Sequence, residues 1–240
     1  MRLSIGEVFA EAWRLYTRSA GRLVTIGAIV FGALALVQIA VASSGNRWIA
    51  LVTLIPFSVG VYWLQGALAV ATDELRRQRL DLSAGEIFGR VRPYLPRLIL
   101  AGLLIALVVG GLVALVFLIS AVPAAVVLAL LFLVLSALWI GVTPAIVLED
   151  RAVIASFRRS HALVRGDLVR VLAIVVLSLV FASIVAAVIK ALFTPLPSPA
   201  SLYLGDLVAN SVTVPFVSLT WTLAFLDLRL NKEGPWTRKT

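Results

Sequence analysis

The chain contains no cysteine and a single histidine among its 240 residues. The absence of cysteine excludes disulfide bonds, thiolate metal sites and cysteine nucleophiles. One histidine cannot form a histidine-cluster metal site. Charged residues are also scarce at 14%, whereas a soluble domain carries about a quarter. The remainder is dominated by apolar residues, with 61% hydrophobic residues and a mean hydropathy of +1.06.

These apolar residues form six stretches, each long enough to cross a bilayer. A crossing helix needs roughly 20 apolar residues at 1.5 Å rise each. Backbone in hydrocarbon must satisfy its own hydrogen bonds, which favours helices. We therefore predict an all-α integral membrane protein with six transmembrane helices, at residues 23–42, 48–72, 98–120, 124–148, 168–193 and 207–226.

The basic residues predict the topology of these helices. Nineteen of the 21 Lys and Arg fall in the N-terminal segment, the second and fourth connections and the tail, while only Arg47 and Lys190 fall on the other side. The positive-inside rule makes the basic side cytoplasmic, so both termini are expected there. The net charge of +9 therefore indicates contact with anionic lipid headgroups rather than with nucleic acid.

A short motif recurs along the chain. Residues 3–9 (LSIGEVF) are repeated at 82–88 (LSAGEIF). Both copies have the form of a capping box, with serine at the N-cap and glutamate three residues later. A third copy without the box begins near Asp150, with Val153, Ile154, Phe157 and Val164 as its apolar face. We expect three amphipathic helices in the cytoplasmic interface, each leading into a pair of spans.

Two spans return the chain to the same side, so the three units are parallel repeats. Their approximate ranges are 1–80, 81–148 and 149–230, followed by a cytoplasmic tail at 231–240. Six arginines on the interfacial helices are candidate lipid-headgroup contacts: Arg14, Arg18, Arg90, Arg158, Arg159 and Arg165.

The even-numbered spans contain prolines, which remove a helical hydrogen bond and bend the helix. Polar residues are concentrated on the sixth span. Either these features line a cavity, or they are packing features and interhelical hydrogen bonds. The candidate cavity-lining residues are Pro56, Pro215, Asn210, Ser211, Thr213, Ser218 and Thr220.

No set of catalytic residues can be assembled. The middle of every span is uncharged, and neither a glycine-rich phosphate loop nor a pair of nucleophile and base is present. His161, on the apolar stripe of the third amphipathic segment, is read as an interfacial filler rather than a pH sensor. We expect no catalytic residue, no cofactor and no metal.

One segment resembles a known family. It consists of Pro144–Asp150 (PAIVLED), Ser156–Ser160 (SFRRS), Leu163–Asp167 (LVRGD) and Val169–Leu172 (VRVL). The pattern resembles the membrane domain fused to some glycerophosphoryl diester phosphodiesterases and related six-span bacterial membrane proteins. The resemblance implies a multi-pass protein of the bacterial inner membrane. It carries over no catalytic residue, because the phosphodiesterase activity of that family belongs to a separate soluble domain.

We therefore expect a non-enzymatic membrane protein that organises or binds lipid or an amphipathic partner. The alternative is a small permease or channel whose cavity is lined by the proline-bearing helices. Membrane lipids are the expected partners, and a homo-oligomer or a membrane partner protein stays open.

Overall fold

The computed structural model describes residues 4–44, 47–77, 83–119, 123–196 and 200–234. Within these helices, side chains are described except at 40–44, 47–58, 116–119, 123–125 and 200. The described residues form helices joined by short connections, with no strand among them. The predicted all-α class is therefore confirmed.

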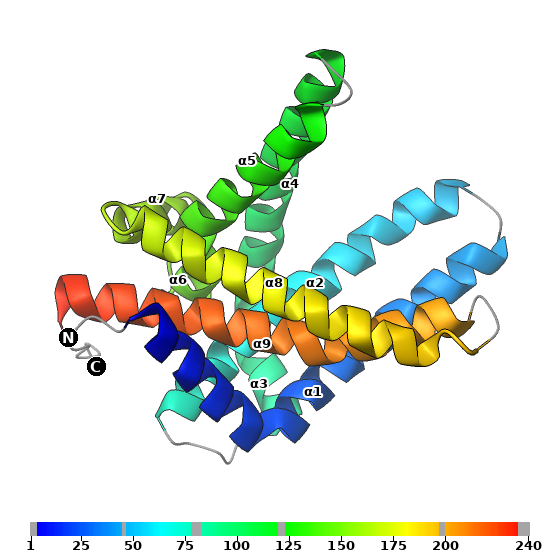
Figure 1. Cartoon of the computed structure of the whole chain (residues 1–240), viewed down its shortest axis with the longest axis horizontal. Coiled ribbons are helices and arrows are strands. Elements are labelled where there is room, and N and C mark those ends of the chain that lie inside the picture. The colour runs from blue at the N-terminus through cyan, green and yellow to red at the C-terminus, as the bar shows by residue number, and fades with distance from the viewer. Residues whose placement is uncertain (1–3, 45–46, 78–82, 120–122, 197–199, 235–240) are drawn as a thin grey trace.

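Three pairs of long helices dominate the fold, and Figure 1 shows the pairs diverging from a common base. The pairs are α1 (Ile5–Ser44) with α2 (Arg47–Arg76), α4 (Leu95–Ile119) with α5 (Pro123–Trp139), and α8 (Leu168–Phe193) with α9 (Ala200–Glu233). The base holds the short helices α3 (Ala84–Val91), α6 (Val142–Glu149) and α7 (Val153–Val164), and a 3₁₀ turn at Arg92–Tyr94 joins α3 to α4. The start of α1 and the end of α9 lie at the same end of the molecule.

Five helical segments are long and apolar enough to cross a membrane. They are Ile5–Ile39, Ala84–Leu115, Val126–Glu149, Leu168–Phe193 and Ser201–Glu233. Each contains most or all of one of the spans expected from the sequence. The remaining expected span, 48–72, falls within α2, and the side chains of its first part lie outside the described residues. Five of the six spans thus have a matching helix, and the sixth stays a prediction.

The three amphipathic segments are helical. Both predicted capping boxes form: the Glu7 N–H donates to Ser4 Oγ at 3.2 Å, and the Glu86 N–H donates to Ser83 Oγ at 3.3 Å. The first segment is not a separate helix, because it continues into the first span through a kink at Ser19, where φ is −126° and ψ is 16°. The third begins after Ala152 without a side-chain cap.

The apolar stripe of the first segment packs on protein. Val8 and Ala12 have no exposed surface, and Tyr16 donates from its hydroxyl to the Val212 carbonyl of α9 at 2.9 Å. The Tyr16 ring meets Phe216 edge-on, with centroids 5.7 Å apart. This stripe holds the N-terminal helix against α9, so burial within the protein accounts for its amphipathic pattern.

An aromatic pair recurs at two of the junctions. Trp63 of α2 meets Phe88 of α3 edge-on at 5.3 Å, and Trp139 of α5 meets Phe157 of α7 edge-on at 5.6 Å. In both cases a long helix packs on the short helix that opens the next predicted unit. Phe9, in the matching position of the first unit, packs 6.4 Å from Phe216 of α9.

Candidate functional site: a cavity beside a broken helix

A cavity of about 410 Å³ lies where the three helix pairs meet. Its size falls in the range of small-molecule binding pockets, about 300–1,000 Å³. Side chains from α2, α4, α5, α6, α8 and α9 line it, and most are apolar. The lining residues are Tyr62, Gln65, Ala69, Leu98, Ala101, Gly102, Ile105, Phe132, Ser136, Trp139, Ile140, Val142, Thr143, Pro144, Leu179, Ala182, Thr213, Val214, Val217, Ser218, Trp221 and Thr222.

One wall of the cavity is a break in a membrane helix. The sequence predicts one span at 124–148, but the structure divides it into α5 and α6 at Ile140–Gly141. Pro144 explains the break, because its nitrogen cannot donate to the carbonyl of Ile140 and its ring crowds that carbonyl. Non-helical backbone at membrane depth is tolerated where it is buried in protein or lines a cavity.

Ser160 of α7 stabilises the break from the side. Its Oγ accepts from the Gly141 N–H at 3.0 Å and donates to the Leu138 carbonyl at 2.6 Å. The Ser160 side chain is completely buried. One hydroxyl therefore satisfies a donor and an acceptor where the helical ladder is interrupted.

Gly141 also fits closely at this point. A Cβ on Gly141 would stand 2.7 Å from the Phe225 ring and 3.1 Å from Ser160 Oγ. A larger residue would therefore displace either α9 or the serine that bridges the break.

The cavity carries hydrogen-bonding groups but no charged side chain among its lining residues. Thr213 and Thr222 donate to carbonyls of their own helix, Ala209 and Ser218, both at 2.8 Å. The Gln65 amide and the Ser136 hydroxyl add further polar groups to the wall. Such a lining suits an uncharged or largely apolar molecule, because an unpaired charge in an apolar site is strongly disfavoured.

Two of the predicted cavity residues, Thr213 and Ser218, line this cavity. Thr220 is completely buried away from it and donates to the Phe216 carbonyl at 2.8 Å. Pro56 lies within α2, and its side chain is outside the described residues. Asn210 is not among the residues that line the cavity.

Ser211 and Pro215 serve helix packing instead. Ser211 donates to the Leu207 carbonyl at 2.7 Å. A Cβ on Gly27 of α1 would stand 3.0 Å from the Ser211 carbonyl oxygen and 3.4 Å from Pro215 Cγ. These two residues therefore form the tight crossing of α1 and α9, which only glycine at position 27 accommodates without a shift.

Sequence reasoning missed Trp139, Gly141 and Ser160. A usable signal was present, since a glycine three residues before a proline inside an apolar stretch indicates a helix break. Nothing in the sequence marks Ser160, which reaches the break only through the packing of α7.

The predicted headgroup arginines have different environments in the structure. Arg14, Arg18, Arg158 and Arg165 are exposed. Arg90 is paired with Glu74 of α2 at 2.7 Å.

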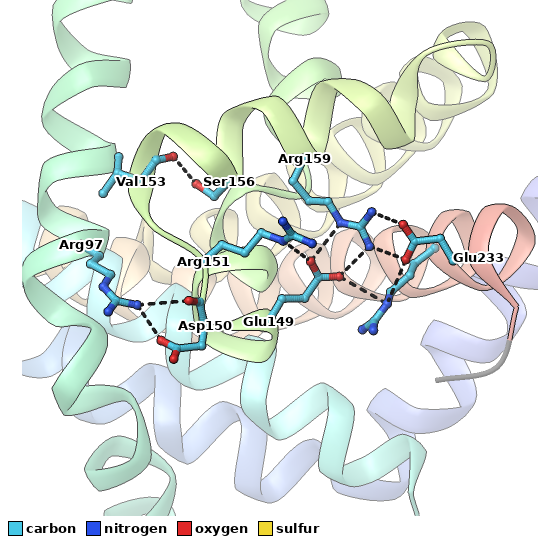
Figure 2. Close-up of polar contacts among 9 residues, drawn as sticks. Arg97, Glu149, Asp150, Arg151, Val153, Ser156, Arg159 and Glu233 are labelled. Atoms are coloured by element: carbon cyan, nitrogen blue, oxygen red, sulfur yellow. Dashed lines mark hydrogen bonds and ion pairs between the residues drawn. The ribbon is translucent and has the colours of Figure 1, made fainter. Parts of the chain in front are cut away.

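Arg159 lies between two carboxylates (Figure 2). It binds Glu149 through Nε and Nη2, each at 2.9 Å, and Glu233 through Nη2 at 2.6 Å. The hydrogen bonds to Glu233 raise the pKa of the Arg159 guanidinium further, and those to Glu149 act in the same direction. We therefore assign Arg159 to this network, which occupies its donors and leaves little for a lipid headgroup.

The network joins three elements at the base. Glu149 also accepts from Arg151 at 2.8 Å and lies 3.3 Å from Arg229 Nε. Asp150, which ends α6 in the left-handed conformation (φ 53°), receives Arg97 of α4 at 2.6 Å. Figure 2 shows these contacts converging on the turn between α6 and α7.

Long apolar helices arranged in pairs around an uncharged cavity, with arginine–carboxylate pairs gathered at one end, define a helical membrane protein. Five of its helices are long and apolar enough to span a bilayer. Within that class, the family model described as Domain of unknown function (DUF7847) matches residues 3–228, so the chain belongs to this family. No curated protein and no solved structure matches the chain.

Proposed function

We propose that this membrane protein binds an uncharged amphipathic or lipid-like molecule in the cavity beside the broken helix, without chemical conversion. The observation that carries the proposal is the cavity itself: about 410 Å³, mostly apolar, with neutral hydrogen-bonding groups. An acyl chain or similar apolar body would contact the walls from α4, α5 and α8. A hydroxyl or ester group would meet the Gln65 amide or the Ser136 hydroxyl.

The proposal includes the membrane arrangement expected from the sequence. It places the protein in the bacterial inner membrane with six spans, three parallel units and both termini cytoplasmic. The asymmetry of Lys and Arg supports the orientation. The two capping boxes and the Trp–Phe pairs at successive junctions support the repeat.

Lipid analysis by native mass spectrometry of the protein released from detergent micelles tests this function. Ser218→Phe fills the cavity, and Leu107→Phe is the matched control because Leu107 is 73% exposed on α4. We expect a retained neutral lipid or lipid-like molecule in the wild type and in the control, and its loss in Ser218→Phe. Equal retention by both variants would contradict binding in the cavity.

A second candidate function, a small permease, is favoured by the broken helix. Discontinuous helices form the substrate sites of many transporters. Cysteine at Ser218 or Thr143 in the otherwise cysteine-free chain would then react with a membrane-impermeant thiol reagent, while cysteine at buried Thr220 would not. Protection of both Ser218 and Thr143 would remove this alternative.

A further inference from the structure

A second hollow, of about 350 Å³, lies at the base of the molecule. We call it the basic vestibule. Three arginines and one aspartate line one part of it: Arg76, Arg77, Arg229 and Asp73. Leu148, Leu226 and Leu230 form an apolar wall. Its lining therefore combines cationic and apolar surface in one site.

The basic vestibule follows the central cavity along the same helices. Ala69 of α2 lines the cavity, and Asp73 lines the vestibule one turn later. On α9, Thr222 lines the cavity and Leu226 the vestibule, again one turn apart. Since four residues of helix rise about 6 Å, the two hollows are close neighbours along the helix axes.

The charges around the vestibule do not balance. Asp73 pairs with Arg77 at 3.0 Å. Arg229 contacts Glu149 at 3.3 Å and Glu233 at 3.8 Å, but both carboxylates make closer contacts with Arg159. Together with Arg151 and Arg76, the group contains five arginines and three carboxylates among the described residues. Among the described residues that line the vestibule itself, arginine outnumbers carboxylate by three to one.

Arg76 stands out within this group. Within the described part of the chain, it forms no ion pair or side-chain hydrogen bond, although it is only partly exposed. The negative ends of the α2, α6 and α9 dipoles reduce the surplus without reversing it, because each is worth at most about half a charge. A planar guanidinium with open donors beside further arginines is suited to a phosphate group.

We propose that the basic vestibule binds a phosphate group, with Arg76 as its principal ligand. The leucine wall and the position at the end of the apolar helices favour the phosphate of an anionic lipid headgroup over free phosphate. An anionic phospholipid would place its phosphate at Arg76 and the first methylene groups of its acyl chains against the leucines. This site is distinct from the central cavity, so either can be correct without the other.

The test uses the full chain in nanodiscs of zwitterionic lipid, with and without phosphatidylglycerol, and in detergent with inorganic phosphate. Binding is measured as retained phosphatidylglycerol by native mass spectrometry and as thermal stabilisation. Arg76→Gln removes the proposed ligand. Arg92→Gln is the matched control, since it removes one exposed arginine from the 3₁₀ turn before α4, which contributes no lining residue to the vestibule. We expect phosphatidylglycerol retention to fall about tenfold in Arg76→Gln and to be unchanged in Arg92→Gln.

If phosphatidylglycerol alone stabilises the protein, the ligand is a lipid headgroup. If inorganic phosphate stabilises it equally, the ligand is free phosphate. Either result supports the site when Arg76→Gln abolishes the stabilisation. Equal losses in Arg76→Gln and Arg92→Gln would overturn it, because general surface charge would then explain binding. No stabilisation of the wild type by either source would also overturn it. Size-exclusion profiles matching the wild type establish that the variants fold. Retention of a neutral lipid in the central cavity is scored separately in the same spectra, which distinguishes failure of this site from failure of the proposed function.

Discussion

Replacement of Ser160 by alanine tests the description of the broken helix most sharply. The change removes one oxygen that is completely buried, accepts from the Gly141 N–H at 3.0 Å and donates to the Leu138 carbonyl at 2.6 Å. A buried donor left without a partner costs about 1–3 kcal/mol. Polar pairs in membrane proteins average nearer 0.6 kcal/mol, with a maximum of about 1.7 kcal/mol. We expect Ser160→Ala to lower the free energy of unfolding by about 1–2 kcal/mol.

Ser156 provides a matched control on the same helix. It is also completely buried, but its hydroxyl donates only to the Val153 carbonyl of its own helix, at 2.6 Å. Ser156→Ala leaves no backbone donor of another helix unpaired, so its cost should be clearly smaller than that of Ser160→Ala. The assay is reversible unfolding in mixed micelles, followed by circular dichroism, with hydrogen exchange at the Gly141 amide. Equal destabilisation by both variants, or unchanged exchange at Gly141 in Ser160→Ala, would refute the assigned role.

Three further changes test other parts of the structure. A Cβ on Gly102 would stand 2.0 Å from the Tyr62 ring, so Gly102→Ala should lower the free energy of unfolding by about 1–3 kcal/mol. Adding Tyr62→Ala to the same chain should restore part of that loss. A stable Gly102→Ala protein would show that α2 and α4 do not meet there. Gly27→Val should lower the thermal unfolding temperature by separating α1 from α9, and an unchanged temperature would contradict that crossing. Glu149→Gln should lower the free energy of unfolding by roughly 2 kcal/mol, because three arginines lose a charged partner. Glu86→Gln, at an exposed helix cap, should lower it by less than about 1 kcal/mol. Equal losses in the two variants would argue against the network.

The features that depend on local sequence could be predicted. The capping boxes at Ser4 and Ser83 require only a serine and a glutamate three residues apart, and both form. Long apolar stretches likewise predicted the helices that five candidate spans now match. The positive-inside argument gave an orientation, which the reporter experiment below tests.

The features that depend on packing could not be predicted. The hydroxyl-rich sixth span suggested a polar pocket, but Ser211 and Thr220 donate to carbonyls one turn earlier in their own helix. Short polar side chains commonly satisfy themselves in this way. The cavity is instead formed by side chains from five of the six long helices together with α6. Arg159 looked like a surface cation until the fold placed Glu149 and Glu233 on both sides of it.

The membrane orientation has its own test. A reporter fused to the C-terminus should be active in the cytoplasm and inactive outside, as should one fused between α2 and α3, because both segments are rich in arginine. Reporters inserted near Arg47 and Lys190 should give the opposite result. Activity of the C-terminal reporter outside the cell would invert the proposed orientation, with the basic vestibule then on the outer face.

The most direct measurement is a cryo-electron microscopy map of the protein in lipid nanodiscs, with an antibody fragment to aid alignment. The proposed function predicts elongated density in the cavity, in contact with Trp139 and reaching the helix break at Ile140–Gly141. A cavity collapsed by closure of the helix pairs, or one occupied by ordered water along its length, would contradict the binding of an apolar molecule there.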